Sequence, residues 1–202
     1  MDTPDFFGRA PRLKLRDPLA EFLGAVREGL IEYTYADAVK LAGHSCPTVA
    51  GAYLLAAKAL ALLYPDAIPE RGAIRVEMRD PQDAGVTGVI AGILGLITGA
   101  AGDGGFKGVA GRFVRRGLLA FGVPMQGLVR FTRGDTGASV ELDYHPERVA
   151  GDPAMKQALA RACSADATAG DRERFATLWQ DRVRAILTGA GGQPVELLRA
   201  SA

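Results

Sequence analysis

The spacing of hydrophobic and polar residues changes several times along this chain, and each spacing predicts a type of element. Apolar residues at helical spacing favour an α-helix, and Asp17 followed by Pro18 is typical of a helix start. The segment 48–64 is apolar on almost every side, so we expect a deeply buried helix there. The helices predicted in this way cover residues 17–29, 36–41, 48–64, 86–97, 153–162 and 172–188.

Alternation of apolar and polar residues indicates the strands. The clearest pair is 127–133 and 138–144, which the turn at residues 134–137 joins into a β-hairpin. Residues 73–78 alternate in the same way, and 32–35 predict a short strand or turn. Few strands among many helices predict an α+β fold, with mixed helices packed on a small antiparallel sheet that contains the hairpin.

Length and apolar content fit one domain, because the chain has 202 residues and is 48% hydrophobic. Residues 1–16 contain Pro and Arg with weak patterning and are expected to form an N-terminal arm. Residues 17–189 are expected to form the single α+β domain, and residues 190–202 a tail.

Charge and cysteine content argue against several classes of protein. The 24 basic and 23 acidic residues give a net charge of +1, which argues against a nucleic-acid partner. The first residues lack a signal-peptide pattern, and glycines interrupt the longest apolar run near 86–101, so we expect no membrane partner. The two cysteines do not require a disulfide, so a reduced, cytoplasmic chain is expected.

The segment Gly-His-Ser-Cys-Pro at residues 43–47 carries the most specific chemistry. It places His44 two residues from Cys46, directly before the predicted helix at 48–64. An imidazole and a thiolate at this spacing can bind one metal ion, and zinc is the default metal for mixed nitrogen and sulfur ligands. The helix N-terminus also favours the thiolate. The alternative is a buried cysteine and a hydrogen-bonded histidine beside a helix cap.

This segment and the parts that follow it resemble the FmdE-like family, which is named after a component of formylmethanofuran dehydrogenase. That family typically has Gly-His-x-Cys-Pro-Gly, a helix with an aromatic residue, a strand ending in an acid, a second helix and a glycine-rich loop with lysine. In this chain Thr48 takes the place of the last glycine of the motif. The same order covers residues 35–122 here. The resemblance implies a metal centre on His44 and Cys46, with cofactor contacts at Tyr53 and Lys107. Relatives carry further cysteines that this chain lacks, so the implied centre is open.

Two further residues are candidates to complete a metal shell. By the resemblance, Glu77 lies on a strand beside the His44/Cys46 loop, where a carboxylate can bind metal or act as a general base. His145 follows the hairpin and is the only other imidazole. The structural alternatives are an arginine-paired acid and a surface histidine.

We therefore expect a metal-binding protein, with zinc as the metal, whose reaction the sequence leaves open. Two ligands from one chain under-fill a zinc shell, so a homodimer is expected, and a small-molecule ligand or metallocofactor can also complete the shell. One alternative function is a carrier that binds haem or another metallocofactor. Another is a thiol-reactive protein that uses Cys46.

The glycine-rich loop at residues 98–108 offers a second kind of site. Backbone N–H groups of such loops can wrap a phosphate, and Lys107, Arg112, Arg115 and Arg116 add positive charge. The pattern is neither a Walker A motif nor a dinucleotide fingerprint. An anion-binding patch and a solvated basic surface are both open.

Overall fold

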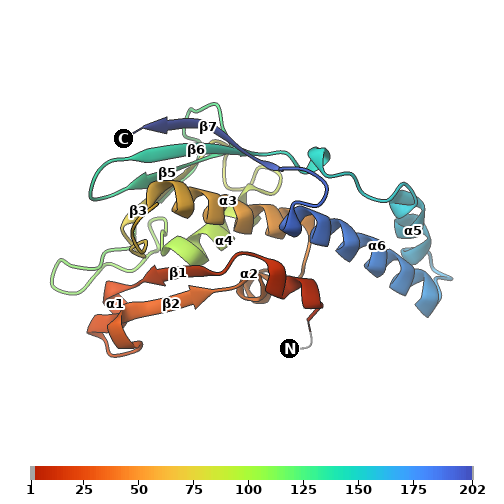
Figure 1. Ribbon diagram of the computed structural model, residues 1–202, viewed down its shortest axis with the longest axis horizontal. Coiled ribbons are helices and arrows are strands. Elements are labelled where there is room, and N and C mark those ends of the chain that lie inside the picture. Colours follow the sequence, from red (N-terminus) through yellow and green to blue (C-terminus); the bar gives the residue numbers. More distant parts are fainter. Residues whose placement is uncertain (1–2, 202) are drawn as a thin grey trace.

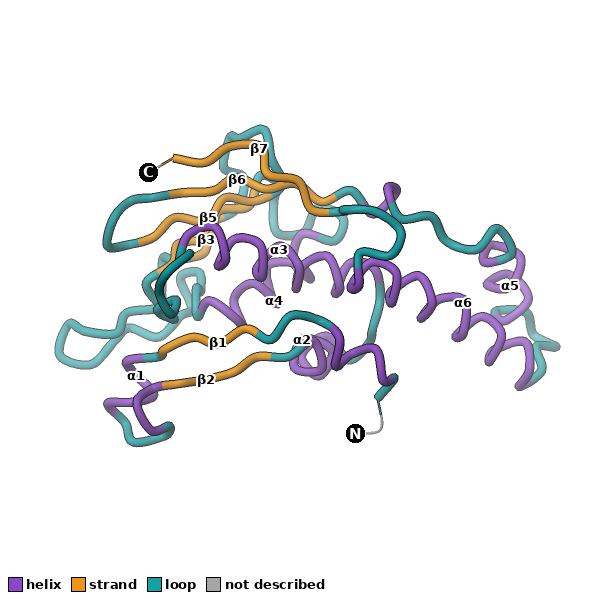
Figure 2. The backbone as a smooth tube through the Cα atoms, viewed as in Figure 1, coloured by secondary structure: helices purple, strands orange, loops and turns teal. Residues whose placement is uncertain are grey.

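The computed structural model describes residues 3–201 and has three layers. Figures 1 and 2 show a five-stranded sheet on one side, the helices α3 and α4 in the middle and a two-stranded sheet on the other side. The helices are α1 (Pro18–Phe22), α2 (Tyr35–Ala42), α3 (Pro47–Leu63), α4 (Thr87–Thr98), α5 (Met155–Ala162) and α6 (Ala169–Thr188). Short 3₁₀ segments are η1 (Asp5–Arg9), η2 (Arg27–Gly29) and η3 (Pro146–Arg148).

The larger sheet has the strand order β4-β3-β5-β6-β7 and is antiparallel except for the β3–β4 pair. The predicted hairpin is confirmed as β5 and β6, and the α+β class is confirmed with it. The strands are β1 (Leu13–Arg16), β2 (Leu30–Tyr33), β3 (Ile74–Met78), β4 (Leu119–Ala120), β5 (Val129–Arg133), β6 (Ser139–Tyr144) and β7 (Val195–Ser201).

Alternation along the strands gives the larger sheet one apolar and one charged face. Val76, Phe131 and Leu142 are buried in the hydrophobic core that also contains residues of α3 and α4. Glu77 and Arg130 are register partners on adjacent strands and project to the opposite face. The helices therefore cover only one face of this sheet near β3 and β5.

Both chain ends are more ordered than the sequence predicts. The predicted arm contains β1, which pairs antiparallel with β2, and residues 195–201 of the predicted tail form β7, paired with β6. The sequence predicted an arm over 1–16 and a tail over 190–202, and it did not predict the strands that these segments contain. Each segment is short and weakly patterned, and its strand conformation depends on a hydrogen-bonded partner far away in sequence.

The helix predicted over residues 17–29 is much shorter, because α1 ends at Phe22. Gly24 adopts a positive φ of 69° and the chain turns back. Leu23, which a longer helix would place on its apolar stripe, is 63% exposed. The turn returns the chain to Leu30, where β2 begins.

At one end of the molecule, α5 and the first part of α6 project beyond the sheet (Figure 1). The helix α6 begins at Ala169, earlier than predicted, because Thr168 and Asp171 form a capping box. In residues 3–201, no helix combines the length and apolar character needed to cross a bilayer.

Candidate functional site

The Gly-His-Ser-Cys-Pro segment connects α2 to α3. Gly43 ends α2 in the left-handed conformation, with φ of 75°, and Cys46 is the N-cap residue of α3. The Cys46 side chain is buried, and its Sγ accepts a hydrogen bond of 3.4 Å from the Val49 N–H. His44 is exposed, and its Nδ1 lies 2.9 Å from the carbonyl oxygen of Ala42. Because a carbonyl only accepts, this contact assigns the proton to Nδ1 and leaves Nε2 as the free nitrogen of the neutral ring.

Ser45, between the two candidate ligands, is the residue that holds this segment in place. Its hydroxyl lies 2.9 Å from the Tyr35 hydroxyl and donates to Oε1 of Gln180 at 3.0 Å. Its carbonyl accepts from Trp179 Nε1 at 3.0 Å and from Gln180 Nε2 at 3.1 Å. The segment is thereby fixed against α6, a contact that the sequence did not predict.

The structure does not bring Glu77 to this segment. Glu77 projects from the face of β3 that points away from the core, whereas Cys46 belongs to the core. Its Oε2 lies 3.7 Å from Nη1 of Arg130, so it is an arginine-paired acid on the charged face of the sheet. β3 lies where the sequence predicted a strand. Side chains alternate between the two faces of the sheet, and this alternation places Glu77 on the face opposite to the core that contains Cys46.

His145 is also held elsewhere, in an acidic cluster at the end of β6. Its Nδ1 lies 3.0 Å from Glu147, and its Nε2 lies 3.3 Å from Glu196 and 3.9 Å from Asp143. Among residues 3–201, no group of three or more His, Cys, Asp or Glu side chains is arranged to hold a metal ion. The described residues therefore do not supply a closed metal shell within one chain.

The two predicted cofactor contacts also lie apart from each other. Tyr53 is completely buried in α3, and its hydroxyl donates to the carbonyl oxygens of Pro11 and Tyr33. It therefore anchors the N-terminal segment to the core, and burial raises the pKa of its phenol well above the usual value. Lys107 is exposed in the glycine-rich loop.

The glycine-rich loop leads into a strongly cationic cavity, which we call the arginine pocket. It has a volume of about 470 Å³ and lies where the end of β1, the residues before β3 and the segment after the loop meet. Its lining contains four arginines and one acidic residue. The residues that define it are Arg16, Pro18, Glu70, Arg71, Gly72, Arg112, Phe113, Val114 and Arg115.

The buried carboxylate of Asp17 organises the inner wall of this pocket. Its Oδ2 accepts from Arg71 Nη1 at 2.8 Å and its Oδ1 from Arg115 Nη2 at 2.6 Å. Burial by itself raises the pKa of Asp17, but hydrogen bonds from Arg71 and from the Ala20 N–H, with the charges of both arginines, outweigh it and lower the pKa. Asp17 is therefore held as a carboxylate shared by two guanidinium groups.

Two donor nitrogens of Arg115 have no acceptor in the described part of the chain. Its Nε and Nη1 are buried and have no hydrogen-bond partner among the described residues. Its side chain is only 8% exposed, and burial lowers its pKa although Asp17 acts in the opposite direction. A buried donor without a partner costs about 1–3 kcal/mol, so its presence in a cavity wall indicates a place for an acceptor.

Two glycines make room for the Arg115 guanidinium. A Cβ added to Gly72 would lie 1.5 Å from Nη1, and one added to Gly99 would lie 2.8 Å from it. The outer wall is strained, because Phe113 is a bulky residue with φ of 61°. The Arg112 guanidinium lies over its ring, 4.7 Å from the centroid.

Part of the arginine pocket is predictable from the sequence. The sequence draws attention to Arg112 and Arg115, because they are basic residues that follow the glycine-rich loop. It gives no such signal for Arg16, Asp17 and Arg71. The sequence indicates Asp17 only as a helix cap, a role it also has through the Leu19 and Ala20 N–H groups. Its second role is to pair with Arg71 and Arg115, and this role is evident only from the burial of Asp17 against these two arginines, which are distant in sequence.

A search against protein-family models gave no match to this sequence, and no curated protein matches it. The resemblance to the FmdE-like family stays a prediction.

Proposed function

We propose that this chain binds a small molecule carrying a phosphate group, and that the phosphate occupies the arginine pocket. The observation that carries the proposal is Arg115, whose Nε and Nη1 donors are buried in the pocket wall without acceptors among the described residues. A phosphate oxygen accepts well from a guanidinium N–H, so a phosphate in the pocket would give one of these unpaired donors an acceptor.

The charge of the pocket also favours an anion. Four guanidinium groups line it, whereas Glu70 is the one acid in the lining and Asp17 lies behind it. Two of the arginines share Asp17, and Arg16 pairs with Glu21 at 2.6 Å. The four guanidinium groups therefore outnumber the carboxylates of Glu70, Asp17 and Glu21 by one, and this excess positive charge favours an anion such as a phosphate.

The present conformation shields the two free donors of Arg115 from solvent. A phosphate would reach them after a small rearrangement of the lining side chains. Arg112 is the residue best placed to move, because its side chain is exposed and stacks on the strained Phe113. Arg112 would then cover the bound phosphate from the solvent side.

The test is a calorimetric titration with inorganic phosphate, and then with a nucleoside monophosphate, at low ionic strength. We expect saturable binding at one site, and Arg112→Ala should weaken it by about tenfold or more, because a charge-assisted hydrogen bond is lost. Arg115→Lys, which keeps the charge but loses the planar fork, should also weaken it, with circular dichroism as the check on folding. Arg27→Ala is the matched control, because Arg27 is an exposed arginine that does not line the pocket.

A general ionic effect would contradict the proposal. Chloride titrated at the same ionic strength would then give the same heat of binding as phosphate. Equal affinities of the Arg112→Ala and Arg27→Ala proteins would also contradict it, because the pocket would then make no special contribution.

The metal-binding function expected from the sequence stays a separate prediction. In its favour, Cys46 lies at a helix N-terminus, and the contact of His44 Nδ1 with Ala42 leaves Nε2 free. Against it, His44 is exposed whereas Cys46 is buried, and Glu77 and His145 lie elsewhere. The described residues do not fit a complete zinc shell.

A further inference from the structure

A second cavity, independent of the arginine pocket, lies along α3. It has a volume of about 540 Å³, within the range of about 300–1,000 Å³ that is usual for small-molecule sites. We call it the apolar groove. Its floor is α3, and its walls are the N-terminal segment at residues 11–14, the end of α6 and the residues that lead into β7.

The groove combines an apolar floor with a rim of one charge sign. Leu54, Leu60 and Ile186 are among the apolar residues that line it. The charged residues of the lining are Arg12, Lys14 and Lys58, and no Asp or Glu of the described residues lines it. Arg12 pairs with Glu32 at 2.8 Å, and both lysines are exposed at the rim.

We propose that the apolar groove binds an amphipathic anion, a medium-chain or long-chain carboxylate. The alkyl chain would lie along α3. Apolar area of the ligand and of the protein would both be removed from water there, and this burial supplies most of the affinity. The carboxylate would lie at the rim beside Lys14 and Lys58. Glu32, the register partner of Lys14 on β2, is paired with Arg12 and does not line the groove. The charge of the rim is the reason for choosing a carboxylate rather than a neutral lipid.

The test uses the full chain and dodecanoate as the probe, at concentrations below micelle formation, with calorimetry as the readout. We expect saturable binding of one dodecanoate per chain. Ala57→Trp should abolish it, because Ala57 lines the groove and indole would fill the space. The double variant Lys14→Glu and Lys58→Glu should weaken it by at least about tenfold, because two attractions become repulsions.

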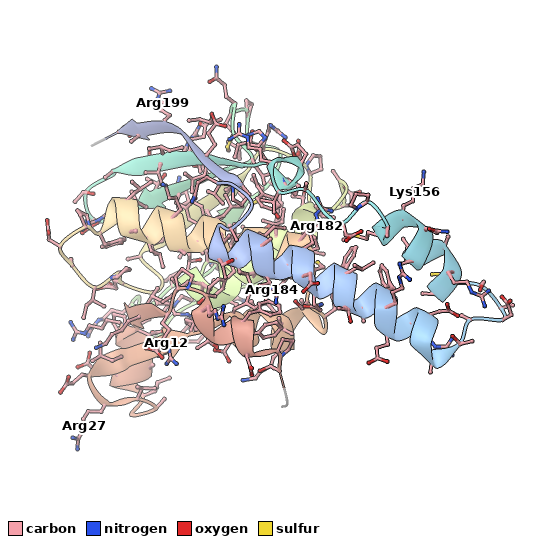
Figure 3. The ribbon with its side chains drawn as sticks, turned by 45° about the vertical axis from the view of Figure 1, so that its right-hand side comes forward. Arg12, Arg27, Lys156, Arg182, Arg184 and Arg199 are labelled. Atoms are coloured by element: carbon pink, nitrogen blue, oxygen red, sulfur yellow. The ribbon has the colours of Figure 1, made fainter. Side chains whose placement is uncertain are left out.

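Two controls separate this proposal from its alternatives. Lys156→Glu reverses a lysine on α5, far from the groove lining, and should leave dodecanoate affinity unchanged (Figure 3). Dodecanol should bind at least about tenfold more weakly than dodecanoate, since it lacks the charge.

Three outcomes would overturn the proposal. Equal affinity for dodecanol and dodecanoate would show that the cationic rim has no role. Dodecanoate binding that survives in both the Ala57→Trp protein and the charge-reversed protein would place the site elsewhere. A dimer by light scattering that Ala57→Trp converts to monomer, with no dodecanoate binding by the wild type, would show that a second copy of the chain occupies the groove.

Discussion

The Oδ1 atom of Asp17 accepts a hydrogen bond of 2.6 Å from Nη2 of Arg115, although 98 positions separate the two residues. This contact joins the start of α1 to the segment that follows the glycine-rich loop. Both side chains are almost fully buried, with 4% and 8% exposure. One ion pair therefore fixes the inner wall of the arginine pocket and also connects two distant parts of the chain.

We predict that Asp17→Asn strongly destabilises the protein. The substitution removes the charge that compensates both Arg71 and Arg115, and removing one partner of a buried pair costs about 3–5 kcal/mol. Urea unfolding followed by circular dichroism measures the change. The control is Asp181→Asn, which breaks the exposed pair with Arg184 and should change stability far less. Equal losses in the two variants would contradict the assigned role of Asp17.

The same carboxylate predicts a pH dependence on the acid side. The pKa of Asp17 is lowered in the folded protein, so the unfolded chain binds more protons and stability rises with pH. The contribution of Asp17 is complete above its unfolded pKa of about 3.9 and is lost as pH falls through the folded pKa. The free-energy difference between wild type and Asp17→Asn should therefore shrink as pH falls from about 5 to about 3. A difference that stays constant over this range would mean that the pair does not depend on the ionised carboxylate.

Two glycines on helices should respond in opposite directions to alanine. A Cβ on Gly51 of α3 would lie 2.2 Å from Cζ of Tyr144, so Gly51→Ala should destabilise the protein by about 1–3 kcal/mol through overpacking. Gly92 of α4 is exposed, with no atom within 4 Å of an added Cβ, so Gly92→Ala should stabilise by up to about 1 kcal/mol through helix propensity. Urea midpoints of both variants test this. A stabilising Gly51→Ala would mean that the Tyr144 ring does not pack on α3.

The metal prediction depends on one cysteine of the two. If His44 and Cys46 bind zinc, Cys46→Ala protein purified without chelator should lose most of its metal, and Cys163→Ala should keep it, because Cys163 is exposed after α5. In the cobalt-substituted protein, azide should shift the visible bands, since two protein ligands leave open positions. Light scattering measures whether metal binding accompanies a dimer. Equal metal content in the two cysteine variants would exclude a centre at Cys46.

The sequence by itself determined the elements whose pattern is local. Strict alternation on both sides of a Gly-Asp-Thr-Gly turn was enough for β5 and β6, and continuous apolar character was enough for α3 and α4. These patterns are enough because a helix or strand with a regular apolar face is stabilised when that face is buried. This holds whichever other element packs against the face. The glycine-rich loop with Arg112 and Arg115 was also visible as a cationic segment.

Only the tertiary structure decided which side chains meet. β7 exists because β6 offers it a free edge, a long-range pairing that leaves little trace in residues 195–201. Glu77 does not join Cys46, because a sheet separates alternate side chains onto two faces and the helices cover only one of them near β3 and β5. His145 lies after β6, where Glu147 and Glu196 hold its ring. Asp17, Arg71 and Arg115 come together because a charge can be buried only beside charges that compensate it. These three residues are far apart in the sequence, so only the folded chain brings them into contact.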